Sequence, residues 1–280
     1  MLVTGIASEI RAFTRGHRAA GRTVAFVPTM GALHAGHVAL IDRAAAESDV
    51  VILSIFVNPM QFNVAADFDR YPRTVEDDLT VARDAGVAAV YLPTADTMYP
   101  EGFDTVVHVD RTAAPLEGTG RPGHFDGVAT VVTKLFAAVE PDVAIFGQKD
   151  FQQLAVVRRM TSDLDLGVRI VGAETVREED GLALSSRNVR LTVDARRAAP
   201  VIKRALDSAA EMITNGETPD SARACFVRTL ATEPAARLEY VSVADITTLV
   251  ETTVVSGPVV ISCAVWFDDV RLIDNVVVPE

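Results

Sequence analysis

The sequence is poor in cysteine and in positive charge. Its two cysteines, Cys225 and Cys263, are too far apart to form the closely spaced pair typical of a metal or redox site. We therefore expect buried thiols in a reducing cytoplasm. Acidic residues outnumber basic ones by 38 to 26, and the net charge is −12. A protein that wraps nucleic acid usually carries a basic stripe, which is not visible here, so we expect no nucleic-acid partner.

Long apolar runs are also missing. None reaches the roughly 18 residues that could span a bilayer, and no basic and apolar leader opens the sequence. We therefore expect a cytoplasmic chain without a membrane partner. The composition, 49% hydrophobic and 23% charged over 280 residues, is typical of a globular protein with one large or two medium domains.

Strand and helix patterns alternate through the first part of the chain. Strands are predicted near 23–28, 50–57, 87–93, 105–109, 143–150 and 168–171, with helices near 6–20, 36–47, 74–85, 126–139 and 151–160. The later part has helices near 192–213 and 218–232 and strands near 237–244, 258–266 and 270–278. The expected fold class is α/β: a Rossmann-like, mostly parallel sheet in an N-terminal domain (1–175), and a smaller α+β C-terminal domain (176–280).

Two histidines stand where the strand at 23–28 turns into a helix, within the stretch PTMGALHAGH at 28–37. His34 and His37 are three residues apart, so one helical turn places both rings on the same side. The helix N-terminus suits a phosphate, and Gly31 and Gly36 let a ligand approach the backbone. A lone histidine here would usually be an ordinary cap residue. Two of only five histidines, at the end of a sheet strand, instead predict a functional site.

Three further strand ends or loops carry polar clusters. They are Asn58 and Gln61, then Lys149, Asp150 and Gln153, then Ser185, Ser186 and Arg187. The first two should converge with the histidines, because carboxyl ends of parallel strands meet at one edge of a sheet. The lysine ammonium is a compact positive charge that suits a polyphosphate. The arginine guanidinium can donate two parallel hydrogen bonds to phosphate oxygens, and the glutamine amide can orient a polar substrate by hydrogen bonding. Each cluster taken alone is a weak signal.

Five motifs, taken in sequence order, resemble the pantoate–beta-alanine ligase family. They are PTMGALHxGH at 28–37, SIFVNPMQF at 54–62, YPRT at 71–74, GQKDxQQ at 147–153 and SSRN at 185–188. The resemblance covers residues 23–191 and is very specific as a set. The HxGH element also places the chain in the wider nucleotidyltransferase group that includes class I aminoacyl-tRNA synthetases.

The resemblance implies an ATP-dependent reaction in two steps. ATP and (R)-pantoate give enzyme-bound pantoyl adenylate and pyrophosphate. The amine of beta-alanine then attacks the adenylate, giving pantothenate and AMP. The resemblance further implies Mg²⁺, a homodimer, and pantoate and beta-alanine as small-molecule substrates.

The resemblance also implies the site residues. ATP binding is expected from Met30, Gly31, His34, Gly36, His37, Gly147, Lys149, Asp150, Val176, Leu184, Ser185, Ser186 and Arg187. Pantoate binding is expected from Gln61 and Gln153, with Asn58 in the same substrate site and beta-alanine also near Gln61. Catalysis is expected from His34, His37, Lys149 and Arg187, which we interpret as hydrogen-bond donors to phosphate, although family descriptions make the residue at His37 a proton donor.

Some alternatives remain open at the level of sequence. Asp77 and Asp78 are usually helix-start charges, and a magnesium site there is the second interpretation. The family often has an acidic residue at Ala35, Glu at Gln148 and Met at Leu184, but none of these departures removes a proposed catalytic group. Two other functions are a nucleotidyltransferase for a phosphorylated acceptor, which would need a basic acceptor pocket, and a catalytically silent nucleotide-binding module, which would have lost a phosphate donor.

Overall fold

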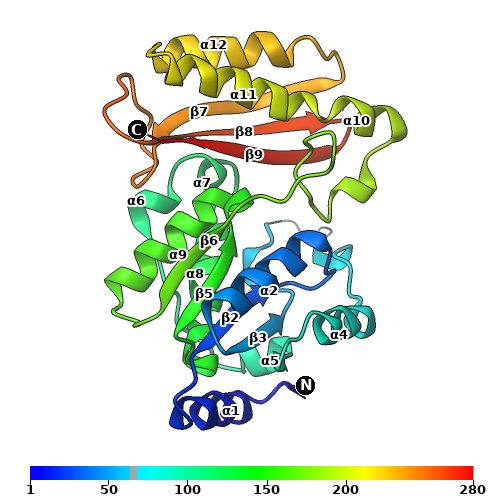
Figure 1. Ribbon diagram of the computed structural model, residues 1–280, viewed down its shortest axis with the longest axis vertical. Coiled ribbons are helices and arrows are strands. Elements are labelled where there is room, and N and C mark those ends of the chain that lie inside the picture. The colour runs from blue at the N-terminus through cyan, green and yellow to red at the C-terminus, as the bar shows by residue number, and fades with distance from the viewer. Residues whose placement is uncertain (64–67, 280) are drawn as a thin grey trace. The chain divides into compact units, whose positions relative to one another are not determined.

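The computed structural model describes residues 1–63 and 68–279. The chain divides into two compact units, one of residues 1–148 and 153–174 and one of residues 149–152 and 175–280. The first contains a parallel sheet with helices, and the second an antiparallel sheet with helices (Figure 1). The predicted fold class is therefore confirmed.

A six-stranded sheet forms the centre of the first unit, in the order β1-β4-β3-β2-β5-β6. Its strands are β1 (Leu2–Thr4), β2 (Val24–Thr29), β3 (Val50–Ile55), β4 (Ala89–Tyr91), β5 (Val143–Gly147) and β6 (Arg169–Ala173). All five neighbouring pairs are parallel. Because β2 lies between β3 and β5, the loops after these three strands leave from the same edge of the sheet.

Helices cover both faces of this sheet, and β2 shows why. Val24 and Phe26 pack into the core shared with α1 and α8, whereas Ala25 and Val27 pack into the core shared with α2 and α4. This alternation follows from the two-residue period of a strand. The helices are α1 (Ala7–Ala19), α2 (Ala35–Glu47), α4 (Val75–Asp84), α5 (Ala95–Met98), α6 (Asp110–Ala113), α7 (Glu117–Gly120), α8 (His124–Val139) and α9 (Phe151–Asp163), with 3-10 turns η1 (Pro59–Gln61) and η2 (Gln148–Asp150).

One strand predicted for this unit is absent from the described residues, and one strand of the structure was not predicted. The strand expected at 105–109 is wrong, because the segment pairs with no strand. The Val107 N–H instead donates to Thr130 Oγ1 on α8 (2.9 Å), so a side chain satisfies the backbone donor that a strand would have paired. The edge strand β1 was not predicted, since its three residues are too few to produce a readable pattern.

The second unit contains a three-stranded antiparallel sheet in the order β7-β8-β9. Its elements are η3 (Asn188–Arg190), α10 (Val193–Ala198), α11 (Val201–Thr214), α12 (Pro219–Leu230), β7 (Ala236–Asp245), β8 (Val259–Phe267) and β9 (Val270–Val278). The single helix predicted at 192–213 is wrong. It is divided into α10 and α11 at Pro200, because proline has no N–H to continue the hydrogen-bond ladder.

Both cysteines lie in this unit, and among the described residues neither forms a disulfide bond. Cys263 on β8 is fully buried, as expected, whereas Cys225 on α12 is only half-buried. None of the helices within residues 1–63 and 68–279 has the length and apolar character needed to cross a bilayer.

Candidate active site

The turn between β2 and α2 is held by the two histidines themselves. His34 is the N-cap of α2, and its Nδ1 accepts a hydrogen bond from the Gly36 N–H (3.1 Å). The Nδ1 of His37 accepts from the His34 N–H (3.2 Å), which completes a reciprocal capping box. The ring centroids are 4.2 Å apart. The two rings therefore lie next to each other, as their three-residue spacing predicts.

This hydrogen bonding selects one tautomer of each ring. A ring nitrogen that accepts an amide N–H carries a lone pair, so in the neutral imidazole the proton is assigned to Nε2. In the neutral form each ring therefore accepts through Nδ1 within the turn and carries its N–H at Nε2. That arrangement suits donation to an anionic ligand, as proposed for phosphate oxygens.

Asp78 on α4 also stabilises this turn. Its carboxylate accepts from the Ala32 N–H (3.0 Å) and the Leu33 N–H (2.7 Å), and the side chain is buried. Gly31 has φ +82°, and a Cβ there would lie 2.8 Å from Asp78 Oδ2. Glycine is therefore required at position 31 both for the left-handed backbone and for the close approach of the carboxylate.

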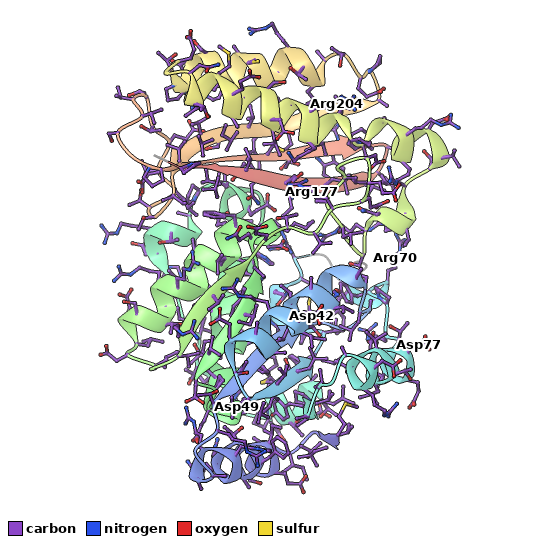
Figure 2. The ribbon with its side chains drawn as sticks, viewed as in Figure 1. Asp42, Asp49, Arg70, Asp77, Arg177 and Arg204 are labelled. Carbon is purple, nitrogen blue, oxygen red and sulfur yellow. The ribbon has the colours of Figure 1, made fainter. Side chains whose placement is uncertain are left out.

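The neighbouring Asp77 has a different position. It is exposed at the outer edge of α4, as Figure 2 shows, whereas Asp78 is buried against the turn. Among the residues that the structure describes, no group of three or more His, Cys, Asp or Glu could hold a metal ion. The magnesium role of this pair stays a prediction, and the geometry instead gives Asp78 a structural role.

We expect Asp78→Asn to lower the free energy of unfolding by about 1.5–3 kcal/mol, because an amide N–H₂ would face a backbone donor. The pyrophosphate release that the family resemblance implies should fall about tenfold as the turn loosens. Urea unfolding and a pyrophosphate assay measure both effects. Asp77→Asn is the matched control, expected to change stability by less than about 0.5 kcal/mol. A raised Mg²⁺ requirement in both variants, at unchanged stability, would instead support the metal site.

A second cluster follows β3, where Asn58 holds Gln61. Asn58 is 1% exposed, and its Nδ2 donates to Gln61 Oε1 (3.0 Å) and to the Gly127 carbonyl (3.0 Å). Its Oδ1 accepts from the Met60 N–H (3.2 Å) and from the Tyr99 hydroxyl (2.7 Å). All four of its hydrogen-bonding positions are thus used inside the protein. Asn58 is suited to position Gln61 rather than to touch a substrate.

Two rings complete this cluster. Burial raises the pKa of the Tyr99 hydroxyl well above its usual value, so Tyr99 remains a donor to Asn58 at physiological pH. The His124 ring and the Arg121 guanidinium both contact the Gln61 carbonyl oxygen, at 2.8 Å and 3.2 Å. Gln61 is therefore fixed through its backbone as well as its side chain.

Gln61 also connects the ends of β3 and β2. Its Nε2 lies 3.1 Å from Met30 Sδ in the histidine turn. A primary amide has two N–H groups and two oxygen lone pairs, so Gln61 keeps one N–H on Nε2 and one lone pair on Oε1 for a ligand. The structure therefore brings together Met30, the histidine turn and Gln61, as the strand-end argument predicted.

The segment after β5 contributes to both units. Gly147 ends β5 and Gln153 lies half-buried in the first turn of α9, both in the first unit. Lys149 and Asp150 belong by their contacts to the second unit. Within residues 1–63 and 68–279, the Lys149 Nζ has neither an ion pair nor a hydrogen bond. Its charge is available to an anionic ligand.

The remaining predicted residues lie on a small hairpin of the second unit. The Leu184 N–H donates to the Val176 carbonyl (2.9 Å), and Arg177 pairs with Ala183. The chain then turns at Ser185, whose Oγ accepts from the Arg187 N–H (3.2 Å). Val176 and the residues from Leu184 to Arg187 thus form one continuous structure, with Ser186 half-buried and Arg187 exposed.

An ion-pair network supports this hairpin from α10. Arg196 donates to Glu178 Oε2 and to Asp180 Oδ2 (2.6 Å). The Arg196 guanidinium lowers the pKa of the Asp180 carboxyl, because the hydrogen bond favours the ionised form. The Asn188 Nδ2 donates to Glu178 Oε1 and to the Ala183 carbonyl, which ties the Ser-Ser-Arg turn to the same network.

Sequence reasoning missed several residues that hold the site. Tyr99 has no local motif, and its role depends on a contact with Asn58 41 residues away in sequence. Arg177 and Asp274 form a bidentate ion pair across 97 residues. The only available signal was the pair Asp274–Asn275, two adjacent polar residues in the otherwise apolar end of β9.

Comparison with known proteins identifies the family. A family model described as "Pantoate-beta-alanine ligase" matches residues 3–277. The pantothenate synthetase of Pelotomaculum thermopropionicum is 47% identical over 281 residues, which covers 100% of both chains. The crystal structure of pantothenate synthetase from Thermus thermophilus superposes with a TM-score of 0.94 at 44% identity and 100% coverage of both chains.

A third relative was solved with ligands. The pantoate–beta-alanine ligase of Francisella tularensis is 31% identical, has a TM-score of 0.80, and covers 99% of this chain and 97% of that one. Its crystal structure is described as a complex with beta-gamma ATP and beta-alanine. The family model and the full-length relatives agree with the motifs and with the fold. The chain therefore belongs to the pantoate–beta-alanine ligase family.

Proposed function

We propose that the pantoate–beta-alanine ligase activity of this chain proceeds through an enzyme-bound pantoyl adenylate. The observation that carries this proposal is the histidine turn, in which both Nδ1 atoms accept backbone N–H groups and the ring proton is thereby assigned to each Nε2. Such N–H donors stabilise charge on a phosphate but provide no nucleophile for covalent attachment of the substrate. A mechanism that activates the carboxylate with ATP fits this chemistry.

In the first step a pantoate carboxylate oxygen attacks the α-phosphorus of ATP. The bond from that phosphorus to the bridging oxygen breaks, and pyrophosphate leaves with the electron pair. The protein must align the two reactants and stabilise the charge that develops on the phosphates. We propose that His34, His37, Lys149 and Arg187 supply this stabilisation as donors. Gln61 and Gln153 would hold pantoate, with Asn58 positioning Gln61.

In the second step the beta-alanine amine attacks the acyl carbon of the adenylate. The bond from that carbon to the phosphate oxygen breaks, and AMP leaves with the electron pair. The beta-alanine nitrogen then loses one proton to solvent, which leaves the neutral amide of pantothenate. No serine or cysteine nucleophile is needed, because the adenylate is already a good electrophile. Excluding water from the adenylate protects it from hydrolysis.

In this mechanism the substrate is ATP with Mg²⁺ bound to its phosphates. Asp78 uses its carboxylate oxygens on the Ala32 and Leu33 amides, and Asp77 lies at the outer edge of α4, so the pair does not fit a metal-binding site. We propose that Mg²⁺ arrives on the phosphates of ATP, since Mg²⁺ commonly keeps substrate phosphates and water as ligands. The expected binding of ATP by residues 30–37, 147–150 and 184–187, with Val176 beside the adenine, follows the family resemblance.

Other expectations stay predictions from the resemblance. These are the homodimer, the cytoplasmic location, and the roles of residues 1–175 in nucleotide and pantoate binding and of residues 176–280 as a lid.

The proposal predicts pantoate-dependent pyrophosphate release from ATP and Mg²⁺ without beta-alanine. The release should stop near one equivalent per site, because the adenylate stays bound, and should become continuous when beta-alanine is added. Rapid-quench measurement of pyrophosphate and AMP distinguishes these phases. The adenylate mechanism is wrong if pyrophosphate appears only when beta-alanine is present. Pyrophosphate release with a phosphorylated acceptor in place of pantoate would favour the nucleotidyltransferase alternative.

A further inference from the structure

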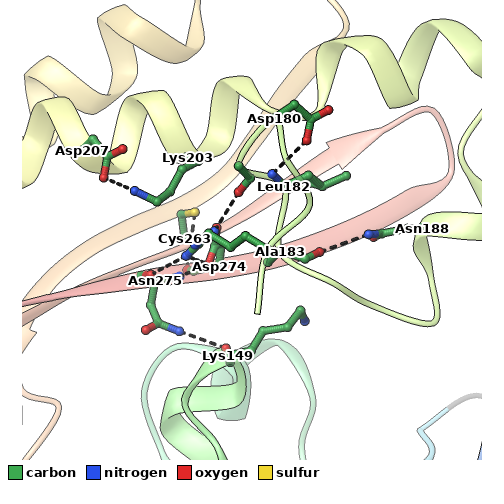
Figure 3. Close-up of polar contacts among 12 residues, drawn as sticks. Lys149, Asp180, Leu182, Ala183, Asn188, Lys203, Asp207, Cys263, Asp274 and Asn275 are labelled. Carbon is green, nitrogen blue, oxygen red and sulfur yellow. Dashed lines mark hydrogen bonds and ion pairs between the residues drawn. The ribbon is translucent and has the colours of Figure 1, made fainter. Parts of the chain in front are cut away.

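The strand β9 touches both cationic segments assigned to ATP in the second unit. Asn275 on β9 is 6% exposed, and its Nδ2 donates to the backbone carbonyl of Lys149 (2.9 Å). Figure 3 shows this hydrogen bond joining the strand to the turn from which the Lys149 side chain extends. Lys149 follows β5 in sequence, but its contacts assign it to the unit built on β9.

The preceding residue, Asp274, holds the other cationic segment. Its two carboxylate oxygens accept from the Arg177 guanidinium at 2.7 Å and 3.0 Å, and the Asp274 side chain is buried. Arg177 also donates to the Gly181 carbonyl (3.0 Å) and pairs with Ala183 across the hairpin. This hairpin leads directly into the Ser-Ser-Arg turn, so β9 supports the backbone that carries Arg187.

The two attachments are joined within β9 itself. The Asn275 N–H donates to Asp274 Oδ1 (2.8 Å), and Arg177 also reaches the Asn275 carbonyl oxygen (3.4 Å). Asp274 and Asn275 are paired in register with Cys263 and Ser262 of β8, which lies at the centre of the antiparallel sheet. The central strand therefore anchors β9, and β9 sets the positions of both segments through two adjacent buried side chains.

We propose that Asn275 is a positioning residue for the pyrophosphate-releasing step, acting through Lys149. By holding the Lys149 carbonyl, Asn275 determines where the Lys149 stem begins and hence where its ammonium meets the phosphates. Asp274 does the same for the Ser-Ser-Arg turn through Arg177. The proposal rests on the proposed role of Lys149, and neither Asp274 nor Asn275 contacts the reacting atoms in this assignment.

The test is a double-mutant cycle between Asn275→Ala and Lys149→Met, measured as the single-turnover rate of pyrophosphate release. In the wild-type background Asn275→Ala is expected to slow release about tenfold, the cost of losing one positioned hydrogen bond. In the Lys149→Met background it should change the rate by less than about twofold. Asn275→Asp, which keeps the size but loses the donor hydrogen, should behave similarly and serves if the alanine variant does not fold. Asn215→Ala and Asn215→Asp are matched controls at the exposed end of α11.

The outcomes separate the two proposals. Equal slowing by Asn275→Ala in both backgrounds would mean a general structural role and would overturn the positioning proposal. The same conclusion follows if Lys149→Met is impaired while both Asn275 variants release pyrophosphate normally. If Lys149→Met itself is as fast as wild type, the proposed function of Lys149 is wrong, and the role of Asn275 falls with it.

Discussion

His34→Asn is expected to reduce pantoyl adenylate formation at least a hundredfold while leaving the stability of the protein nearly unchanged. Asparagine is a good N-cap, and its Oδ1 can accept the Gly36 N–H that His34 Nδ1 accepts now. It cannot replace the distal Nε2–H. The variant therefore removes the proposed phosphate donor and keeps the turn. A hundredfold loss corresponds to about 2.7 kcal/mol of transition-state stabilisation.

His34→Ala provides the comparison for this experiment. Alanine removes the cap as well as the donor, so it should lose a similar amount of activity and an additional ~1 kcal/mol of stability. Pantoate-dependent pyrophosphate release and thermal unfolding of both variants measure the two effects separately. Near-normal release by His34→Asn would show that His34 acts only as a cap, and phosphate stabilisation would then have to come from the other donors.

Lys149→Met is also expected to reduce pyrophosphate release at least a hundredfold. The substitution keeps most of the apolar stem and removes the ammonium, whose charge has no partner among the described residues. Because the protein has a net charge of −12, local cations must hold the phosphates against a repulsive background. The loss should appear in kcat as well as in the KM for ATP if Lys149 contacts the leaving pyrophosphate in the transition state.

The chain offers a close control among its few lysines. Lys203 on α11 pairs with Asp207, as Figure 3 shows, and Lys203→Met makes the same chemical change outside the proposed site. We expect its rate of pyrophosphate release to stay within about twofold of wild type. A loss limited to the KM for ATP in Lys149→Met would indicate uniform binding of ATP and would contradict a role in the chemical step.

The local pattern of the sequence was sufficient for most of the fold. A nearly continuous apolar run, such as β3, predicts a strand that is buried on both faces of a sheet. An amphipathic stretch, such as α2, predicts a helix that is buried on one face. The two wrong predictions have different causes, one a tertiary contact and one a local break. The valines of 105–109 resemble a strand, but the Thr130 hydroxyl takes the N–H of Val107. Pro200 divides a helix whose apolar periodicity continues across it.

The motifs were also sufficient to identify the family, because residues that follow consecutive strands keep fixed spacings along the chain. The site residues predicted from the same motifs stay predictions. What only the tertiary structure decided is how those groups are held. The Asp78 carboxylate accepts a hydrogen bond from the histidine turn, from a residue 45 positions away in sequence. The Asn58 amide donates to the side-chain oxygen of Gln61. The Asn275 amide donates to the Lys149 carbonyl, 126 positions away. A hydrogen bond between distant residues has no periodicity in the sequence, since the partner can come from any element that the fold brings near. The sequence alone therefore determined the family and the residues predicted to carry the chemistry, and the tertiary structure determined which distant side chains hold those residues in place.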